Sequence, residues 1–146
     1  MVTSLFGQAG GFPGTGMDET DCGPQGNLLH LPLPKGSGRE VFLRALRQRA
    51  LPFLLCEKPP ALLLICAGFD ALLTDPLATM TLDPDDFGQS VRIIRHEFAF
   101  PAERIALGLE GGYALSAEAG MPAALVQTCA ALVEEHTGGA EGMTYS

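Results

Sequence analysis

Two largely apolar segments, residues 61–67 and 104–109, have the pattern expected of strands in a parallel sheet. The first continues through Gly and Phe without a charged side chain and ends directly on Asp70. Strands buried on both faces of a parallel sheet have such continuous apolar sequences, rather than an alternation of apolar and polar residues. We therefore expect the chain to deliver Asp70 to the carboxyl edge of a sheet, where α/β proteins place their functional groups.

Apolar residues at helical spacing predict a helix over residues 38–54, a second over 83–98 and a third from near Met121 to before Gly138. The second begins with Asp-Pro-Asp-Asp, which provides an N-cap residue, a proline at the first helical position and two carboxylates at the positive end of the helix dipole. Pro52 is expected to end or kink the first helix.

The elements follow one another as strand (residues 2–6), long loop (7–26), helix, strand, helix, strand and helix. This order predicts an α/β domain of three layers, with a parallel sheet and helices on both of its faces. The carboxyl ends of parallel strands meet at one edge, so Asp70 and Tyr113 are candidates for a common pocket. We expect the domain to occupy residues 1–136 and a disordered tail to occupy 137–146.

Composition narrows the possible functions. The chain has 146 residues, of which 47% are hydrophobic, enough for one domain. Seventeen acidic and nine basic side chains give a net charge of −8, which argues against nucleic-acid binding and suits a cationic ligand. An acidic surface that only keeps a protein soluble explains the same charge. No apolar stretch is long enough to span a membrane and no leader is evident, so a cytoplasmic location is predicted.

The cysteines and histidines give no sign of a metal site of their own. Cys22, Cys56, Cys66 and Cys129 lack the spacing of a zinc finger or a disulfide framework. Cys66 is expected to behave as a small apolar residue within its strand. His30, His96 and His136 have no partner at ligand spacing, so surface or structural roles are expected for them.

Five short motifs occur in a fixed order: Phe12-Pro13-Gly14-Thr15-Gly16, Asn27-Leu28-Leu29-His30-Leu31-Pro32-Leu33-Pro34, Ala67-Gly68-Phe69-Asp70-Ala71, Asp75-Pro76-Leu77 and Leu109-Glu110-Gly111-Gly112-Tyr113. Together they resemble the C-terminal half of a zinc-dependent histone deacetylase or acetylpolyamine amidohydrolase, over roughly residues 2–135. The resemblance implies a partial arginase/deacetylase-like fold. It also implies hydrolysis of an acyl amide on lysine or a polyamine, with Zn²⁺ as the cofactor.

The same resemblance assigns roles to individual residues. Asp70 takes the position of a zinc ligand, and Tyr113 takes that of the tyrosine that donates a hydrogen bond to the substrate carbonyl oxygen and its tetrahedral anion. Considered alone, Asp70 also fits a carboxylate that caps a turn, and Tyr113 fits a packed tyrosine. The ordered set of motifs favours the catalytic roles. Asp75 is expected to accept backbone N–H bonds within a turn.

Substrate contacts follow from the same comparison of motifs. Phe12 and Leu77 are expected to line a narrow apolar slot for the acyl-lysine or acyl-polyamine stem. Gly111 and Gly112 would let the backbone and the phenol approach the substrate closely.

Two further motifs of the family, Asp-x-His and His-His, lie N-terminal to the matched region in its members and do not occur in this sequence. The zinc site is therefore expected to be incomplete. We expect the chain alone to bind zinc poorly, to lack deacetylase activity, and to self-associate or pair with a partner chain through an exposed sheet edge.

Two other functions are alternatives to the deacetylase interpretation. The first is a non-catalytic α/β interaction module that pairs with a separate N-terminal half. The second, a nucleotide-binding domain, is disfavoured because residues 7–16 contain neither G-x-G-x-x-G nor a Gly-Lys-Ser/Thr ending.

Overall fold

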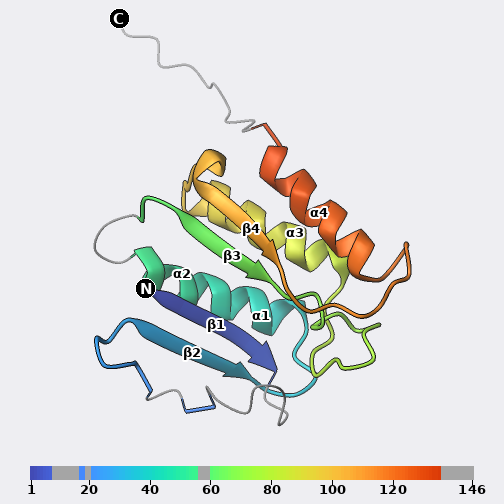
Figure 1. Ribbon diagram of the computed structural model, residues 1–146, viewed down its shortest axis with the longest axis horizontal. Helices are drawn as coiled ribbons and strands as arrows, with labels where there is room; N and C mark the ends of the chain where they lie inside the picture. Colours follow the sequence, from blue (N-terminus) through green and yellow to red (C-terminus); the bar gives the residue numbers. More distant parts are fainter. Residues whose placement is uncertain (8–16, 19–20, 56–59, 136–146) are drawn as a thin grey trace, which may run out of the picture.

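A computed structural model describes residues 1–7, 17–18, 21–55 and 60–135. Four strands all point in one direction (Figure 1). They form two parallel pairs, β1 with β2 and β3 with β4. The predicted parallel α/β architecture is confirmed, and the segment around His30 is an additional strand. The bounds are β1 Val2–Gly7, β2 Leu28–Leu33, β3 Leu63–Ala67 and β4 Ile105–Leu109.

The three predicted helices are present with nearly the predicted bounds. The first changes its hydrogen-bonding pattern from α to π type and back to α, and the second changes from α to π type, in each case without a break in the helix. A short 3₁₀ turn, η3, precedes β4. The segments are α1 Arg39–Ala45, η1 Leu46–Ala50, α2 Leu51–Leu55, α3 Pro84–Arg92, η2 Ile93–Glu97, η3 Ala102–Arg104 and α4 Met121–Val133.

Pro52 is expected from the sequence to end or kink the first helix. It does not end the helix, because α2 continues through this residue to Leu55. The preceding turn, η1, is a π turn, in which the N–H of Leu51 bonds to the carbonyl of Leu46. Proline lacks an N–H and its ring clashes with the carbonyl four residues earlier in an α-helix. The wider π turn gives room at the point where that clash would occur.

The helices cover one face of the strands, and α3 passes behind β4 in Figure 1. One core cluster contains Leu31 of β2, Leu51 of α2, Leu63 of β3 and Ile93 of η2. The two strand pairs therefore rest on the same helices, although no hydrogen-bonded ladder joins β1 to β3 among the described residues.

The opposite face of β3 is open. Leu63 and Ala67 are buried, whereas Leu64 is 63% exposed and Cys66 is exposed as well. The prediction of helices on both faces is therefore met on one face only, within the part of the chain that the structure describes. Cys66, which is expected to behave as a small apolar residue, lies exposed on the face of β3 that the described helices do not cover.

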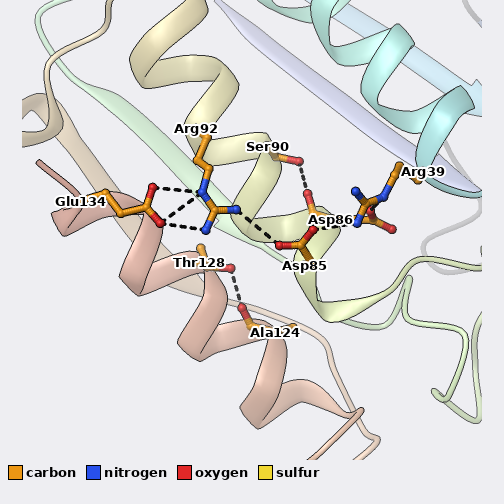
Figure 2. A network of polar contacts seen from close by, with 8 residues as sticks. All are labelled: Arg39, Asp85, Asp86, Ser90, Arg92, Ala124, Thr128 and Glu134. Carbon is orange, nitrogen blue, oxygen red and sulfur yellow. Dashed lines mark hydrogen bonds and ion pairs between the residues drawn. The ribbon is translucent and has the colours of Figure 1, made fainter. Parts of the chain in front are cut away.

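A network of charged side chains joins three helices (Figure 2). Arg39 of α1 pairs with Asp85 at 2.8 Å and with the buried carboxylate of Asp86, both on α3. Arg92 of α3 bonds to Glu134, just beyond α4, at 2.8 Å, and contacts Asp85 at 3.4 Å. The hydrogen bond from Arg39 holds the pKa of Asp85 below its ordinary value.

The carboxylate of Asp86 also completes the predicted helix start. It accepts the backbone N–H of Asp83, the N-cap residue, at 2.9 Å, which forms a capping box around Pro84.

We expect the free energy of unfolding to fall as the pH is lowered below about 4.5. Hydrogen bonds from arginine lower the folded-state pKa of Asp85, Glu97 and Glu134. A lowered carboxylate pKa contributes stability in full above the unfolded-state pKa and loses it as the pH falls through the folded-state value. Urea titrations at pH values from about 6 down to about 3 will measure this decline.

A matched variant tests the origin of the decline. In the wild type, Arg47 bonds to Glu97 at 2.6 Å and Arg92 bonds to Glu134 at 2.8 Å. The double variant Arg47→Gln, Arg92→Gln removes both arginine partners. The acid-induced loss of stability should be shallower in this variant. Parallel curves for the variant and the wild type would contradict the assignment.

Candidate functional site

The loops that follow β3 and β4 begin side by side at the carboxyl edge of the strands (Figure 1). Two backbone bonds continue the pairing into these loops. Glu110 N–H donates to the carbonyl of Ala67 at 3.1 Å, and Phe69 N–H donates to the carbonyl of Gly111 at 2.7 Å. Residues that follow either strand are therefore held at one edge.

Asp70 lies at this edge with an exposed side chain. Its carboxylate lies against the backbone of the neighbouring loop: a Cβ placed on Gly111 would be 2.6 Å from Asp70 Oδ2. A Cβ on Gly68 would be 3.2 Å from Oδ1. The glycine at position 111 thus provides the space that the carboxylate occupies.

Gly112 has a φ of +138°, a backbone conformation that residues with a Cβ rarely adopt. A Cβ at this position would also lie 2.9 Å from the Cβ of Phe69. The chain therefore crosses closely over Phe69 before it reaches Tyr113, whose side chain is 56% exposed.

A buried carboxylate, Asp75, connects the two loops. Its side chain is 6% exposed. Oδ1 accepts the N–H of Leu77 at 2.9 Å, which confirms the predicted turn. Oδ2 accepts the N–H of Tyr113 at 2.6 Å and that of Ala114 at 3.1 Å. The sequence motif Asp-Pro indicates the first contact, but it contains no signal for the second.

The structure thus brings most of the predicted site residues to one edge. Asp70, Gly111, Gly112 and Tyr113 lie on the two adjacent loops, and Leu77, which is 66% exposed, lies on the turn fixed by Asp75. Phe12 is outside the described residues. The roles of these residues in binding and catalysis stay predictions.

The described residues do not by themselves assemble a metal site. Within the ranges 1–7, 17–18, 21–55 and 60–135, no group of three or more His, Cys, Asp or Glu side chains is arranged to hold a metal ion. Catalytic zinc ordinarily has three protein ligands and an open position. Asp70 can supply one carboxylate at most.

The described helices are too short or too polar to cross a membrane.

Gly111→Ala is expected to displace the Asp70 carboxylate while changing the free energy of unfolding by about 1 kcal/mol. The added methyl group meets Asp70 Oδ2 and Cγ, the movable end of a side chain, at 2.6 Å and 2.9 Å. Carbon-13 NMR of the Asp70 carboxyl group, together with thermal unfolding, will measure both effects.

Gly108→Ala on β4 is the matched control, because a Cβ there meets no atom within 4 Å. It should leave the Asp70 carboxyl signal in place. An unchanged signal in Gly111→Ala would show that the carboxylate is not held against this loop.

Most of the chain is similar to known proteins. Residues 1–129 match the family defined by the histone deacetylase domain. An uncharacterized Synechocystis protein, slr0245, is 42% identical over 104 residues, which cover 71% of this chain and 32% of that protein. The histone deacetylase-like amidohydrolase of Pseudomonas aeruginosa is 35% identical over 114 residues, which cover 73% of this chain and 29% of the relative.

Solved structures give the same fold. An acetylpolyamine aminohydrolase from Burkholderia pseudomallei superimposes with a TM-score of 0.73 at 24% identity, over 89% of this chain and 36% of that chain. The predicted arginase/deacetylase-like fold is therefore confirmed, in partial form. This chain spans about a third of the length of these proteins.

Proposed function

The chain belongs to the histone deacetylase domain family, and we propose that it supplies one wall of an active site that hydrolyses the amide bond of an acylated amine. One observation supports this most strongly. Asp70 and Tyr113 follow two hydrogen-bonded parallel strands at the same edge, and both side chains are open to solvent.

Tyr113 is proposed to stabilise the developing oxyanion. Attack on an amide carbonyl moves negative charge onto its oxygen, and a positioned hydroxyl donor stabilises that charge more than it stabilises the substrate. The phenol is well suited because it is 56% exposed on a loop whose backbone is fixed by Asp75. Gly112 brings this loop close to the edge of the strands.

Asp70 is proposed as one ligand of a catalytic zinc ion. The family is generally zinc-dependent, and a bound zinc ion would polarise the amide carbonyl and activate water. The described residues offer no complete ligand set, so further ligands must come from polypeptide outside them.

The proposed substrates are acetylated lysine side chains and acetylpolyamines. The proposal draws on the names of two similar proteins: a relative, the Pseudomonas histone deacetylase-like amidohydrolase, and a structural neighbour, the Burkholderia acetylpolyamine aminohydrolase. The chain's net charge of −8 favours cationic substrates of either kind. Leu77 and Phe12 are proposed to contact the apolar stem of the substrate. A cytoplasmic location is proposed as well.

A chimera tests the proposal. The segment of the Pseudomonas amidohydrolase that matches this chain, 114 residues long, is replaced by the corresponding residues of this chain. The zinc-loaded chimera should release acetate from an acetyl-lysine peptide or from N-acetylspermidine. A chimera that folds and binds zinc but releases no acetate from either substrate would contradict the proposal.

A second function, a non-catalytic interaction module, has its own support. Leu62 and Leu64 expose 58% and 63% of their surface next to the open face of β3. In the described part of the chain, β1 pairs only with β2 and β3 only with β4, so each pair has unpaired edges. Such edges favour pairing with another polypeptide. We propose a separate N-terminal half as the partner under this alternative.

Sedimentation of the chain, alone and mixed with the unmatched part of the Pseudomonas relative, separates the two functions. Complex formation without acetate release would favour the interaction module. Acetate release that depends on both Asp70 and Tyr113 would favour the hydrolase.

A further inference from the structure

We propose that Asp75 is a positioning residue for Tyr113: its buried carboxylate fixes the backbone from which the phenol projects. The inference rests on the proposed function, because it concerns the residue assigned to the oxyanion. Asp75 has no place in that chemistry, and nothing in its sequence motif connects it with residue 113.

The two oxygens of the Asp75 carboxylate bind two different segments of the chain. Oδ1 binds the N–H of Leu77 within the turn that contains Asp75 itself. Oδ2 binds two consecutive N–H groups, those of Tyr113 at 2.6 Å and Ala114 at 3.1 Å, 38 and 39 residues away along the chain. Asp75 is 6% exposed, so water does not compete freely for these bonds.

The rest of the loop is anchored on either side of this point. The carbonyl of Gly111 accepts a bond from Phe69, and that of Ala114 accepts one from the N–H of Met121 at 2.8 Å. Tyr113 lies between these anchors with a side chain that is 56% exposed, so core packing does not hold its ring. Its orientation therefore depends on the backbone, which Asp75 fixes.

The chemistry of the acceptor suggests the variant. An ionised carboxylate has two accepting oxygens, whereas the asparagine amide has one oxygen and an NH₂ group that only donates. Asp75→Asn must turn its NH₂ toward the N–H of Leu77 or toward those of Tyr113 and Ala114. With the NH₂ toward Tyr113 and Ala114 their bonds are lost, and with the oxygen toward them a neutral acceptor replaces a charged one, so the bonds to residues 113 and 114 weaken in either orientation.

Amide hydrogen exchange measured by NMR tests the positioning directly and without an activity assay. Asp75→Asn should accelerate exchange at Tyr113 and Ala114 by at least about tenfold, because hydrogen bonds to charged groups are among the stronger ones in proteins. Exchange at Glu110, whose N–H bonds to Ala67, should stay unchanged. The matched control is Asp21→Asn, since Asp21 is an exposed residue that accepts an N–H two residues later, from Gly23 at 3.1 Å.

A spectroscopic measurement reports on the ring itself. The chain has two tyrosines and no tryptophan, so Tyr145→Phe leaves Tyr113 as the sole fluorophore of either kind. In that background, Asp75→Asn should lower the fluorescence anisotropy of the remaining tyrosine. If Asp75→Asn fails to fold, Asp75→Glu, which keeps the charge but shifts it by one methylene group, takes its place with the same expected direction.

Two results would overturn the positioning role: unchanged exchange at residues 113 and 114, or equal acceleration of all amides, including those of β3 and β4. The latter would show that Asp75 only stabilises the fold.

In the active chimera, Asp75→Asn should lower kcat with little change in KM, and it should add little to the loss caused by Tyr113→Phe. An effect on KM alone would overturn the inference. An inactive chimera with fast exchange in Asp75→Asn would reject the proposed function and leave the positioning role supported.

Discussion

Replacing Phe69 with alanine is expected to lower the free energy of unfolding by about 3–5 kcal/mol. The ring is 1% exposed and clusters with Leu72, Ala67 and Ala124. It also contacts the ring of Phe87, with centroids 5.0 Å apart and planes inclined by 59°. Removal of the ring loses this buried apolar surface and leaves a cavity between β3 and α4, which the surrounding helices can fill only in part.

The same substitution should loosen the candidate site. A Cβ placed on Gly112 would lie 2.9 Å from the Phe69 Cβ, so the loop after β4 packs closely against this residue. Amides of that loop should therefore exchange faster in Phe69→Ala than expected from the global loss of stability alone.

Urea unfolding followed by circular dichroism will measure the effect of Phe69→Ala. Leu73→Ala is the control, because Leu73 is 61% exposed and its truncation should change stability by less than about 0.5 kcal/mol. Phe69→Leu should fall between the two, since it refills part of the cavity. Equal losses for Phe69→Ala and Leu73→Ala would show that position 69 is not part of the core.

Tyr113→Phe is expected to lower kcat of the zinc-loaded chimera by about 10²–10³-fold, with little change in KM. The substitution removes one hydroxyl group and keeps the ring. A donor that acts on the developing oxyanion stabilises the transition state more than the bound substrate, so its loss appears in kcat. Stability should change little, because the side chain is 56% exposed.

Initial rates with an acetyl-lysine peptide over a range of concentrations will separate kcat from KM. Leu115→Ala is the control, since Leu115 lies on the same loop, is 75% exposed and has no assigned role. A rise in KM at constant kcat would place Tyr113 in substrate binding. No change in either constant would remove it from the site.

The sequence by itself determined the features that depend on neighbouring residues. The capping box at Asp83 and Asp86, the turn in which Asp75 accepts the N–H of Leu77, and the strands that end before Asp70 and Glu110 all follow from local patterns. The sequence also indicated the family, because each of the family's motifs is a short run of residues and the motifs follow one another in a fixed order along the chain. The cap and the turn depend on contacts between residues only a few positions apart. The extent of each strand follows from the length of its apolar run.

Only the tertiary structure decided which distant groups meet and which surfaces stay open. The bond from Tyr113 to Asp75 joins residues 38 positions apart, and no local pattern encodes it. The continuous apolar sequence of β3 predicted burial on both faces, yet Leu64 and Cys66 are exposed because the described helices cover one face alone. Apolar side chains make a strand face suitable for burial, but whether the face is buried depends on which other segments pack against it.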